Sequence, residues 1–432
     1  MDSRKVLLRE VAVSTKDSIA PQDGVEYWHY SLPSFDAGRK PVKEDGSDIR
    51  SSKLLVRKGD ILCNKLNMRF RRVWRVNEEL PNSVCSTEFI PLQAKAVNRD
   101  YLYYVLISDD FTNKMTSMRS GTSGSHQRVK PEQLLSYEFE LPDESNQERI
   151  AGVLSSIDSK IAVNQRINDY LAEMVMSTSR DMYWEYEAGN ANLPAGWRWV
   201  RLDDVTTLIS RGITPKYDEN SDETVLGQTC IRGNLILAEN GRRHRPKRIN
   251  EKWLQRGDLL INSTGVGSLG RTAQVWFDPE KLTVDSHITI VRASDPEHAL
   301  YLGFWAFAHE RYIESLHTGS TGQTELPRDH VRSISLVLPD AETLDRFNTV
   351  AGPAVETIVA NQAENKQLSV LRDALLPKLM SGEIDVSKVE IPTLLNNHLA
   401  TYWAIGVDTA AVFIGCGIIR AIANSANQLG LL

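Results

Sequence analysis

Two clusters of basic side chains are the residues in this sequence best suited to chemistry with a polyanion. One cluster comprises Lys65, Arg69, Arg71, Arg72 and Arg75, and the other comprises Arg242, Arg243, Arg245, Lys247 and Arg248. Because the formal net charge of the chain is −6, such local concentrations of positive charge stand out. Guanidinium groups pair with phosphates and bond bidentately to guanine edges in the major groove. With Arg128 and Arg271, these residues are candidate DNA contacts; a solvated surface loop is the alternative interpretation.

Two loops rich in Gly, Ser and Thr are also candidates for contact with phosphates. They read "SGTSGSHQR" from Ser120 and "TGSTGQTE" from Thr318. Successive backbone N–H groups in such loops bind phosphate oxygens, whereas a plain turn before the next strand explains the composition equally well. Both interpretations stay open at this point.

Signatures of catalysis and of metal binding are missing from the sequence. There is no Gly-x-x-x-x-Gly-Lys loop, no Gly-x-Ser-x-Gly elbow and no His-Glu-x-x-His motif, and the nine His are scattered singly. Four widely separated Cys suggest neither a zinc site nor disulfides, so a reducing cytoplasm is the expected location. The "GVGSLG" from Gly265 matches a dinucleotide fingerprint, but the following "RTAQVWF" alternates like a strand where that fingerprint needs a helix. We therefore expect no catalytic residue, cofactor or metal in this chain.

The sequence also repeats itself over the length of a domain. "RKGDILCN" from Arg57 matches "QRGDLLIN" from Gln255, and the "LPD" ending at Asp143 matches the one ending at Asp340, at an offset of 197 residues. From there the register holds without a gap to Leu171 and Leu368. Such a period indicates two similar domains, each followed by a similar second element, and not a stack of small repeats.

That second element is predicted to be a long helix in both copies. Apolar and Asn residues recur at alternating steps of four and three, which is the seam spacing of a coiled coil. The seam residues are Ile157, Ile161, Asn164, Asn168 and Leu171 in the first copy, and Ile358, Asn361, Asn365 and Leu368 in the second. Each helix packs on its own domain, or the two pair with each other; the matched Asn favour pairing. Gly352-Pro353 is expected to kink the second helix or delay its start, and Pro377 to end it.

The domains themselves are predicted to be α+β. Short apolar runs such as "DILCN", "DLLIN", "HITIVRA" and "SISLVLP" have the pattern of strands. "DYLYYVLISDDFTNKM" and "ALYLGFWAFAHERYIESL" have helical spacing, and their aromatic residues are expected in the core, not in a base-stacking platform.

Taken in order, these motifs resemble a family. The Gly-Asp strand, the Gly/Ser/Thr loop, "LPD" followed by "NQERIAGVL", and "LRDALLPKLMSGEIDV" from Leu371 are similar to type I restriction-modification DNA specificity subunits over residues 1 to 390. The resemblance implies two target recognition domains that each read half of a bipartite DNA site, in a pseudo-two-fold arrangement. A pair of long antiparallel helices, forming a coiled coil, would separate them and dock two methyltransferase subunits.

The resemblance also assigns the chemistry to other chains. It implies that S-adenosylmethionine, ATP and Mg are bound by partner subunits, that methylation falls on adenine N6, and that restriction subunits join the complex. The expected domains are a first recognition domain at 1–142, a central helix at 143–190, a second recognition domain at 191–339 and a C-terminal helix at 340–390. Two alternatives remain: a helical scaffold that never touches DNA, and a DNA-modifying enzyme whose motifs are not recognisable.

Residues 391–432 are an apolar tail that the resemblance does not cover. The segment from Leu399 to Ile419 is nearly long enough to span a bilayer, but Asp408 lies near its middle and no Lys or Arg cluster flanks it. A helical hairpin, a partner-binding segment or a product of gene rearrangement are the interpretations we prefer to a membrane span.

Overall fold

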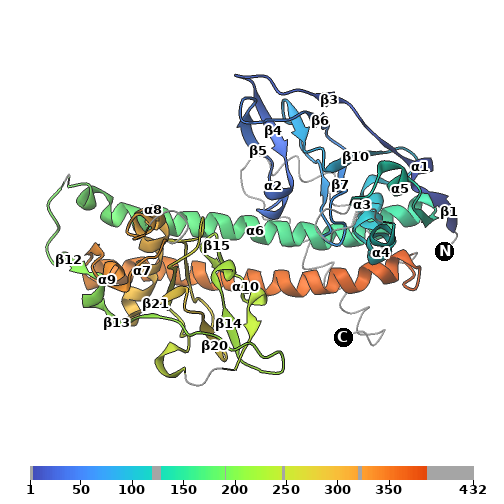
Figure 1. Ribbon diagram of the computed structural model, residues 1–432. Coiled ribbons are helices and arrows are strands. Elements are labelled where there is room, and N and C mark those ends of the chain that lie inside the picture. Colours follow the sequence, from blue (N-terminus) through green and yellow to red (C-terminus); the bar gives the residue numbers. More distant parts are fainter. Residues whose placement is uncertain (1–2, 119–127, 190, 246–248, 320–323, 387–432) are drawn as a thin grey trace. The chain divides into compact units, whose positions relative to one another are not determined.

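The structure is a computed structural model that describes residues 3–118, 128–189, 191–245, 249–319 and 324–386. It divides into two compact units, the first within Met1–Val163 and Asn365–Leu432 and the second within Asn164–Glu364. Each unit combines a globular domain with one stretch of each of two long helices, α6 (Glu144–Glu187) and α10 (Ala341–Met380) (Figure 1). We call the globular parts domain 1 and domain 2. The predicted α+β class, with two similar domains and two long helices, is confirmed.

Domain 1 is built on two sheets. The first is antiparallel, in the order β2 (Ala12–Ser14), β10 (Phe89–Ala94), β7 (Ile61–Asn64) and β8 (Val73–Arg75). The second has the order β3 (Ser18–Ile19), β6 (Lys53–Leu55), β9 (Ser83–Cys85), β4 (Glu26–Tyr30) and β5 (Val42–Asp45). Strand β1 (Ser3–Leu7) pairs with β11 (Glu138–Pro142). The helices are α1 (Leu8–Val11), α2 (Leu32–Asp36), α3 (Arg99–Ile107), α4 (Asp109–Ser117) and α5 (Pro131–Leu135).

Domain 2 repeats the first sheet and the terminal strand pair. Its antiparallel sheet has the order β13 (Thr206–Arg211), β21 (Ile288–Ala293), β18 (Leu259–Asn262) and β19 (Thr272–Gln274), and β12 (Arg198–Arg201) pairs with β22 (Ser335–Leu338). The smaller sheets are β17 (Arg242–Arg243), β14 (Thr224–Leu226) and β20 (Leu282–Val284), and β15 (Ile231–Arg232) with β16 (Leu235–Ile236). The helices are α7 (Pro296–Ala308), α8 (Glu310–Ser315) and α9 (Arg328–Arg332), with 3-10 turns η1 (Leu202–Val205), η2 (Gln228–Cys230), η3 (Ala238–Asn240) and η4 (Asn250–Lys252).

The duplicated Gly-Asp motif forms the same turn in both domains. Gly59 and Gly257 have φ values of 98° and 92°, in the left-handed region that favours glycine. The carboxylate of Asp60 accepts the N–H of Arg57 at 2.9 Å, and Asp258 accepts that of Gln255 at 2.8 Å. The next residues enter β7 and β18, which are wholly buried because each lies inside its sheet. The repeat therefore encodes a turn and the central strand that follows it.

The aromatic residues of α3 and α7 anchor the terminal strand pair in each domain. Tyr101 and Tyr301 are fully buried, and their hydroxyls donate to the backbone oxygens of Glu140 at 3.1 Å and Val337 at 2.6 Å. Tyr104 and Phe304 are fully buried as well. The expectation that the aromatic residues of these stretches belong to the cores is confirmed for α3 and α7, but Tyr312 of α8 is exposed.

Helix α10 differs from its predicted bounds. It begins at Ala341 and continues through Gly352 and Pro353, so this pair does not delay its start, and it ends at Met380, with Pro377 in its last turn. Proline in a helix removes one backbone hydrogen bond. Ala351 and Ala354, on either side of the pair, are buried in the core of the second unit. Burial of the neighbouring residues outweighs the missing bond.

The two long helices pack together antiparallel in each unit. In the second unit, Asn164 donates to Glu364 at 2.6 Å and Asn361 donates to Asn168 at 2.8 Å. A later residue of α6 thus pairs with an earlier residue of α10, as antiparallel helices require. In the first unit, Asp158 of α6 accepts from Arg372 of α10 at 3.0 Å. Both helices also contribute to the domain cores: Ile157 and Leu368 with partly buried Ile161 in the first unit, and Ile358 with partly buried Leu171 in the second. Asn365 is half-buried.

Three cysteines in the described residues, Cys63, Cys85 and Cys230, are buried and unpaired. Across the described part of the chain, no helix is both long and apolar enough to cross a membrane. The apolar tail at 391–432, including the candidate span, lies outside the described residues.

Candidate nucleic-acid interface

In domain 1, the strand that follows the Gly-Asp turn ends beside the Gly/Ser loop. Val129, just after that loop, donates its N–H to the backbone oxygen of Lys65 at 3.0 Å, and Lys65 donates its own N–H to Glu88 at 2.8 Å. Arg128 forms a bidentate pair with the Glu88 carboxylate, at 3.1 and 2.9 Å. Most of the loop itself, residues 119–127, lies outside the described residues. Three separate segments therefore converge at this edge of the sheet.

Domain 2 has the same convergence at the equivalent positions. Leu326 donates its N–H to the backbone oxygen of Ser263 at 2.8 Å, and Ser263 donates to His287 at 2.9 Å. Polar side chains fill this edge: Gln228 donates to the backbone oxygen of Thr264 at 2.9 Å, and the Thr264 hydroxyl lies 2.9 Å from Nδ1 of His287. Residues 320–323 of the Gly/Ser loop are outside the described ranges. We call these two edges the convergent rims.

The rim of domain 2 is electrostatically mixed. Arg211 donates to the carboxylate of Glu325 at 2.9 Å and to the backbone oxygen of Leu326 at 2.8 Å. Burial raises the pKa of the Asp285 carboxyl, although the hydrogen bond from the His287 N–H acts in the opposite direction. The residues Gln228, Thr264, His287 and Arg211 were not among the sequence candidates. A signal was available, since Ser263 and Thr264 directly follow the repeated "LLIN".

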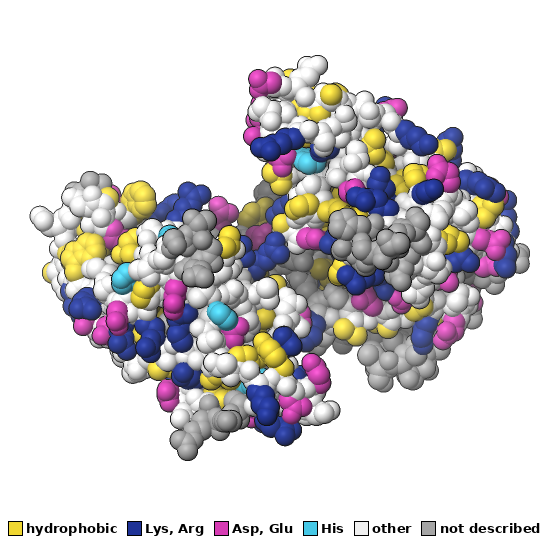
Figure 2. All heavy atoms as spheres, in the orientation of Figure 1, with side chains coloured by type: hydrophobic (Ala, Val, Ile, Leu, Met, Phe, Trp, Pro, Cys, Tyr) yellow, Lys and Arg dark blue, Asp and Glu magenta, His cyan; other side chains and the backbone are white. Residues whose placement is uncertain are grey.

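The first basic cluster lies in the β7–β8 turn and, with Arg75, in β8, and acidic neighbours pair with most of its members. Arg72 forms a bidentate pair with Asp36 at 2.7 Å, and Arg71 pairs with Asp109. Arg69 is exposed and lies over the ring of Phe70, 4.9 Å from its centroid. Figure 2 shows the same interleaving of basic and acidic side chains over the face it draws. Of this cluster, Arg69 and Lys65 are the members without a described ion pair.

The second cluster lies on a different element. Arg242 and Arg243 form β17, at the edge of β14, and Arg242 stacks 3.4 Å from the ring centroid of Tyr217. Arg243 donates to the backbone oxygen of Asp222 at 2.9 Å, and the exposed Arg245 pairs with Asp218 at 3.1 Å. Lys247 and Arg248 fall outside the described residues.

The two basic clusters do not occupy corresponding places in the two domains. The β18–β19 turn, which corresponds to the first cluster, carries Gly265–Gly270 and Arg271 instead of a basic run. Arg271 is half-buried, and its side chain makes no ion pair within the described part of the chain. The glycines are followed by strand β19, as predicted, and not by the helix that a dinucleotide site requires. The spacing of the second cluster from the Gly-Asp motif in the sequence did not show that this cluster lies in a different sheet from β18, the strand that follows the motif.

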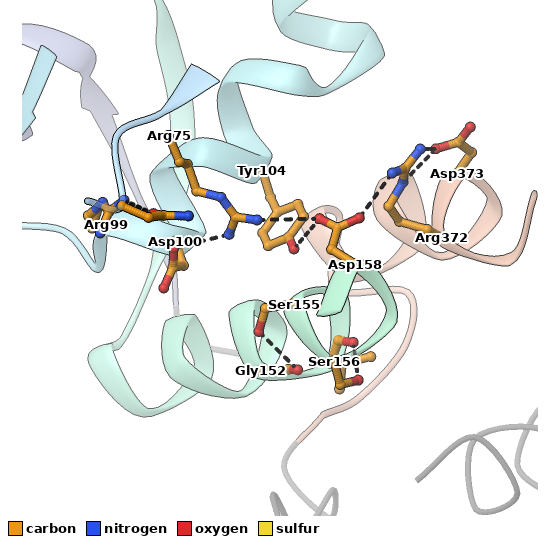
Figure 3. A network of polar contacts seen from close by, with 12 residues as sticks. Arg75, Arg99, Asp100, Tyr104, Gly152, Ser155, Ser156, Asp158, Arg372 and Asp373 are labelled. Carbon is orange, nitrogen blue, oxygen red and sulfur yellow. Dashed lines mark hydrogen bonds and ion pairs between the residues drawn. The ribbon is translucent and has the colours of Figure 1, made fainter. Parts of the chain in front are cut away.

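Arg75 is held inside domain 1 by the polar network drawn in Figure 3. Its guanidinium pairs with Asp100 at 3.1 Å and with Asp158 of α6 at 3.7 Å, and it stacks 4.2 Å from the Tyr103 ring centroid. Burial raises the pKa of the Tyr104 hydroxyl, and the adjacent Asp158 carboxylate raises it further, so this hydroxyl remains a donor to Asp158 at 2.8 Å. These contacts hold Arg75 between domain 1 and helix α6, so we assign it a role in the fold.

No group of His, Cys, Asp and Glu side chains in the described ranges is arranged to hold a metal ion. Polar rims with Gln, Asn, His, Thr and Arg side chains suit hydrogen bonding to base edges and phosphates. Residues 50–173 and 194–350 match the family described as the type I restriction modification DNA specificity domain. The chain belongs to this family. That membership confirms the resemblance noted from the sequence and the prediction that the chain is a non-catalytic specificity subunit.

Individual members of this type I family are distant in sequence. The specificity subunit of the type I restriction enzyme HindI from Haemophilus influenzae is 22% identical over 406 residues, covering 77% of this chain and 88% of the relative. That of MjaIX from Methanocaldococcus jannaschii is 23% identical over 314 residues, covering 67% and 70%. The crystal structure of a type I S subunit from M. genitalium has a TM-score of 0.53 at 14% identity, covering 88% and 96% of the two chains. This likeness concerns the fold.

Proposed function

We propose that this chain reads a bipartite DNA target, with one half-site for each domain. The observation that carries the proposal is the repeated rim: in both domains the end of the Gly-Asp strand and the residue after the Gly/Ser loop are joined by the same backbone bond, Val129 to Lys65 and Leu326 to Ser263. The rims differ in side chains, with Lys65, Glu88 and Arg128 in one and Gln228, Thr264 and His287 in the other. Two similar scaffolds with different polar side chains would recognise two different sequences.

Phosphate contacts would come chiefly from the exposed cations of the two basic clusters. Arg69 in domain 1 and Arg242, Arg243 and Arg245 in domain 2 are exposed. Surface ion pairs such as that of the exposed Arg245 with the half-buried Asp218 contribute little to stability, so a phosphate can replace the carboxylate at small cost. Arg72 and Arg75 have mostly buried side chains and multiple partners, and we assign them to the fold.

The helices would set the gap between the half-sites and dock two methyltransferase subunits, which bind S-adenosylmethionine and methylate adenine N6. Restriction subunits with ATP and Mg would complete the complex in the cytoplasm, where thiols such as those of Cys63, Cys85 and Cys230 stay reduced. Within this complex, the present chain supplies DNA specificity and the partners supply the chemistry.

A domain exchange tests the proposal. Residues 1–142 are replaced by the corresponding domain of a relative, and the complex with the methyltransferase is tested for its target. We expect one half-site to change while the other stays the same. If both halves changed, or neither did, the assignment of one half-site to each domain would be wrong. The same exchange at residues 191–339 should change the opposite half.

A further inference from the structure

Asp158 is the junction of the polar network in the first unit (Figure 3). One oxygen of its carboxylate accepts from the Tyr104 hydroxyl at 2.8 Å and lies 3.7 Å from Arg75, and the other accepts from Arg372 of α10 at 3.0 Å. The side chains of Asp158 and Arg372 are 15% and 23% exposed, so the pair is largely removed from water. Losing one partner of such a pair is costly, because the remaining charge stays buried.

The corresponding positions of the second unit are apolar. The 197-residue offset that relates Asp143 to Asp340 places Val355 at the position of Asp158 and Val175 at that of Arg372. Both valines are buried in one hydrophobic core. Phe304 takes the place of Tyr104, since Tyr101 and Tyr301 are equivalent in the fold. At this junction the first unit therefore joins α6 to α10 by an ion pair, and the second joins them by apolar contact.

A chain made of two similar halves has an alternative set of partners. Helix α6 of one chain has the seam to pair with α6 of a second chain, and α10 with a second α10. The Asn residues do not prevent this, because the same offset would bring Asn164 of one α6 opposite Asn168 of the other. The Asn168–Asn361 bond therefore has an equivalent in either pairing, whereas the bond from Asn164 to Glu364 would be lost between two copies of α6, because Ile167 stands at the position that corresponds to Glu364.

The charged pair distinguishes these pairings. Between two copies of α6, each Asp158 would face Val175, and between two copies of α10, each Arg372 would face Val355. In two chains, the correct α6–α10 pairs contain two Asp158–Arg372 ion pairs and two contacts between Val175 and Val355. Self-pairing would replace all four of these contacts with contacts between a charged side chain and a valine. We propose that Asp158 and Arg372 are the pairing determinants that make α6 select α10 and reject a second copy of itself. This proposal concerns assembly and does not depend on DNA reading.

Cleavage of the full chain between α6 and β12 tests the selection without the advantage of a covalent link. A protease site in the exposed connection yields an N-terminal and a C-terminal piece, and native mass spectrometry counts their pairings after dilution and re-equilibration. The wild type should give only mixed pairs. The triple variant Tyr104→Phe, Asp158→Val, Arg372→Val gives the first unit the apolar junction of the second. If mixed pairs and self-pairs then have equal affinities, about half of all pairs will be self-pairs. Glu173→Gln, an exposed charge change on the same helix, should behave as the wild type.

Two results would overturn the proposal: mixed pairs alone from the folded triple variant, or self-pairs from the wild type. If the triple variant does not fold, co-expression of two full-length variants decides the matter. Arg372→Asp and Asp158→Arg each place like charges together within one chain, and exchange of helices between them restores both pairs. We expect a 1:1 dimer only when both are present. The same oligomeric state for each variant alone and for the mixture would contradict the proposal.

Discussion

Asn361 donates a hydrogen bond to Asn168 across the helix pair, with 2.8 Å between its Nδ2 and the Oδ1 of Asn168. Both side chains come from seam positions, and both residues are half-buried. A polar pair at a coiled-coil seam reduces stability somewhat but fixes the register, because sliding by a turn would leave each amide against apolar side chains. The register of α6 on α10 thus depends on an identifiable pair.

The Asn pair predicts a non-additive double-mutant cycle. Asn361→Leu alone should lower the free energy of unfolding by about 1–2 kcal/mol, because the Asn168 amide loses its partner in a half-buried position. The double variant Asn168→Leu, Asn361→Leu should recover most of that loss, since neither polar group then remains. Urea unfolding measures both. A double variant as unstable as the sum of the single variants would contradict the pairing.

The duplicated turn predicts unequal costs for the same substitution. Gly59→Ala and Gly257→Ala should each cost about 1–2 kcal/mol, because alanine is disfavoured at positive φ. Nothing lies within 4 Å of a Cβ at Gly59, whereas a Cβ at Gly257 would lie 3.2 Å from that of Ala299. Gly257→Ala should therefore lower the thermal midpoint more than Gly59→Ala. Equal shifts would show that backbone strain alone sets the cost.

Much of the fold follows from the sequence, and the reasons are local. The Gly-Asp turns, the central strands and the long helices carry strong patterns, so their existence was predictable. The continuation of α10 through Pro353 was not, since it depends on burial of Ala351 and Ala354 in contacts that are distant in the chain. The same applies to Arg75: its spacing resembled a phosphate contact, but Asp158, more than eighty positions away in sequence, pairs with it.

The rims show where sequence reasoning stopped for the candidate site. Lys65 and Arg128 were selected for charge, and the structure joins their segments. Gln228 and His287 reach Thr264 only because η2 and the residues after β20 fold back to the end of β18. The repeated "LLIN" points to Thr264, which follows it closely, but nothing in the sequence links Gln228 and His287 to this edge, so only the sheet topology reveals those two residues.

The basic strand β17 predicts a change in salt dependence. Replacing Arg242, Arg243 and Arg245 by Gln in the assembled complex should weaken DNA binding and flatten the slope of log affinity against log salt by up to about 0.9 per lost phosphate contact. A matched triple variant, Arg198→Gln, Arg201→Gln, Arg332→Gln, makes the same charge change away from β17 in domain 2 and should leave the slope unchanged. Equal slopes for both variants would remove β17 from the interface.

His244 predicts a loss of stability on mild acidification. It is fully buried, its ring nitrogens have no partner among the described residues, and burial lowers its pKa from 6.5. The unfolded chain therefore binds a proton below about pH 6.5 while the folded chain does not, so stability falls as pH drops toward the lowered pKa. His244→Phe should remove that slope in urea unfolding, and the exposed His317→Phe should not. An unchanged slope in His244→Phe would contradict this assignment.

The central claim is that two domains read two half-sites at a gap set by the helices. Mapping adenine methylation in cells that express this chain with its methyltransferase tests it most directly. Four residues are inserted after Leu171 in α6 and four after Ile358, opposite it in α10, which lengthens the pair by ~6 Å at ~1.5 Å per residue. We predict the same two half-sites, separated by one or two more base pairs at ~3.4 Å each. An unchanged gap in a folded, methylating complex would contradict the claim.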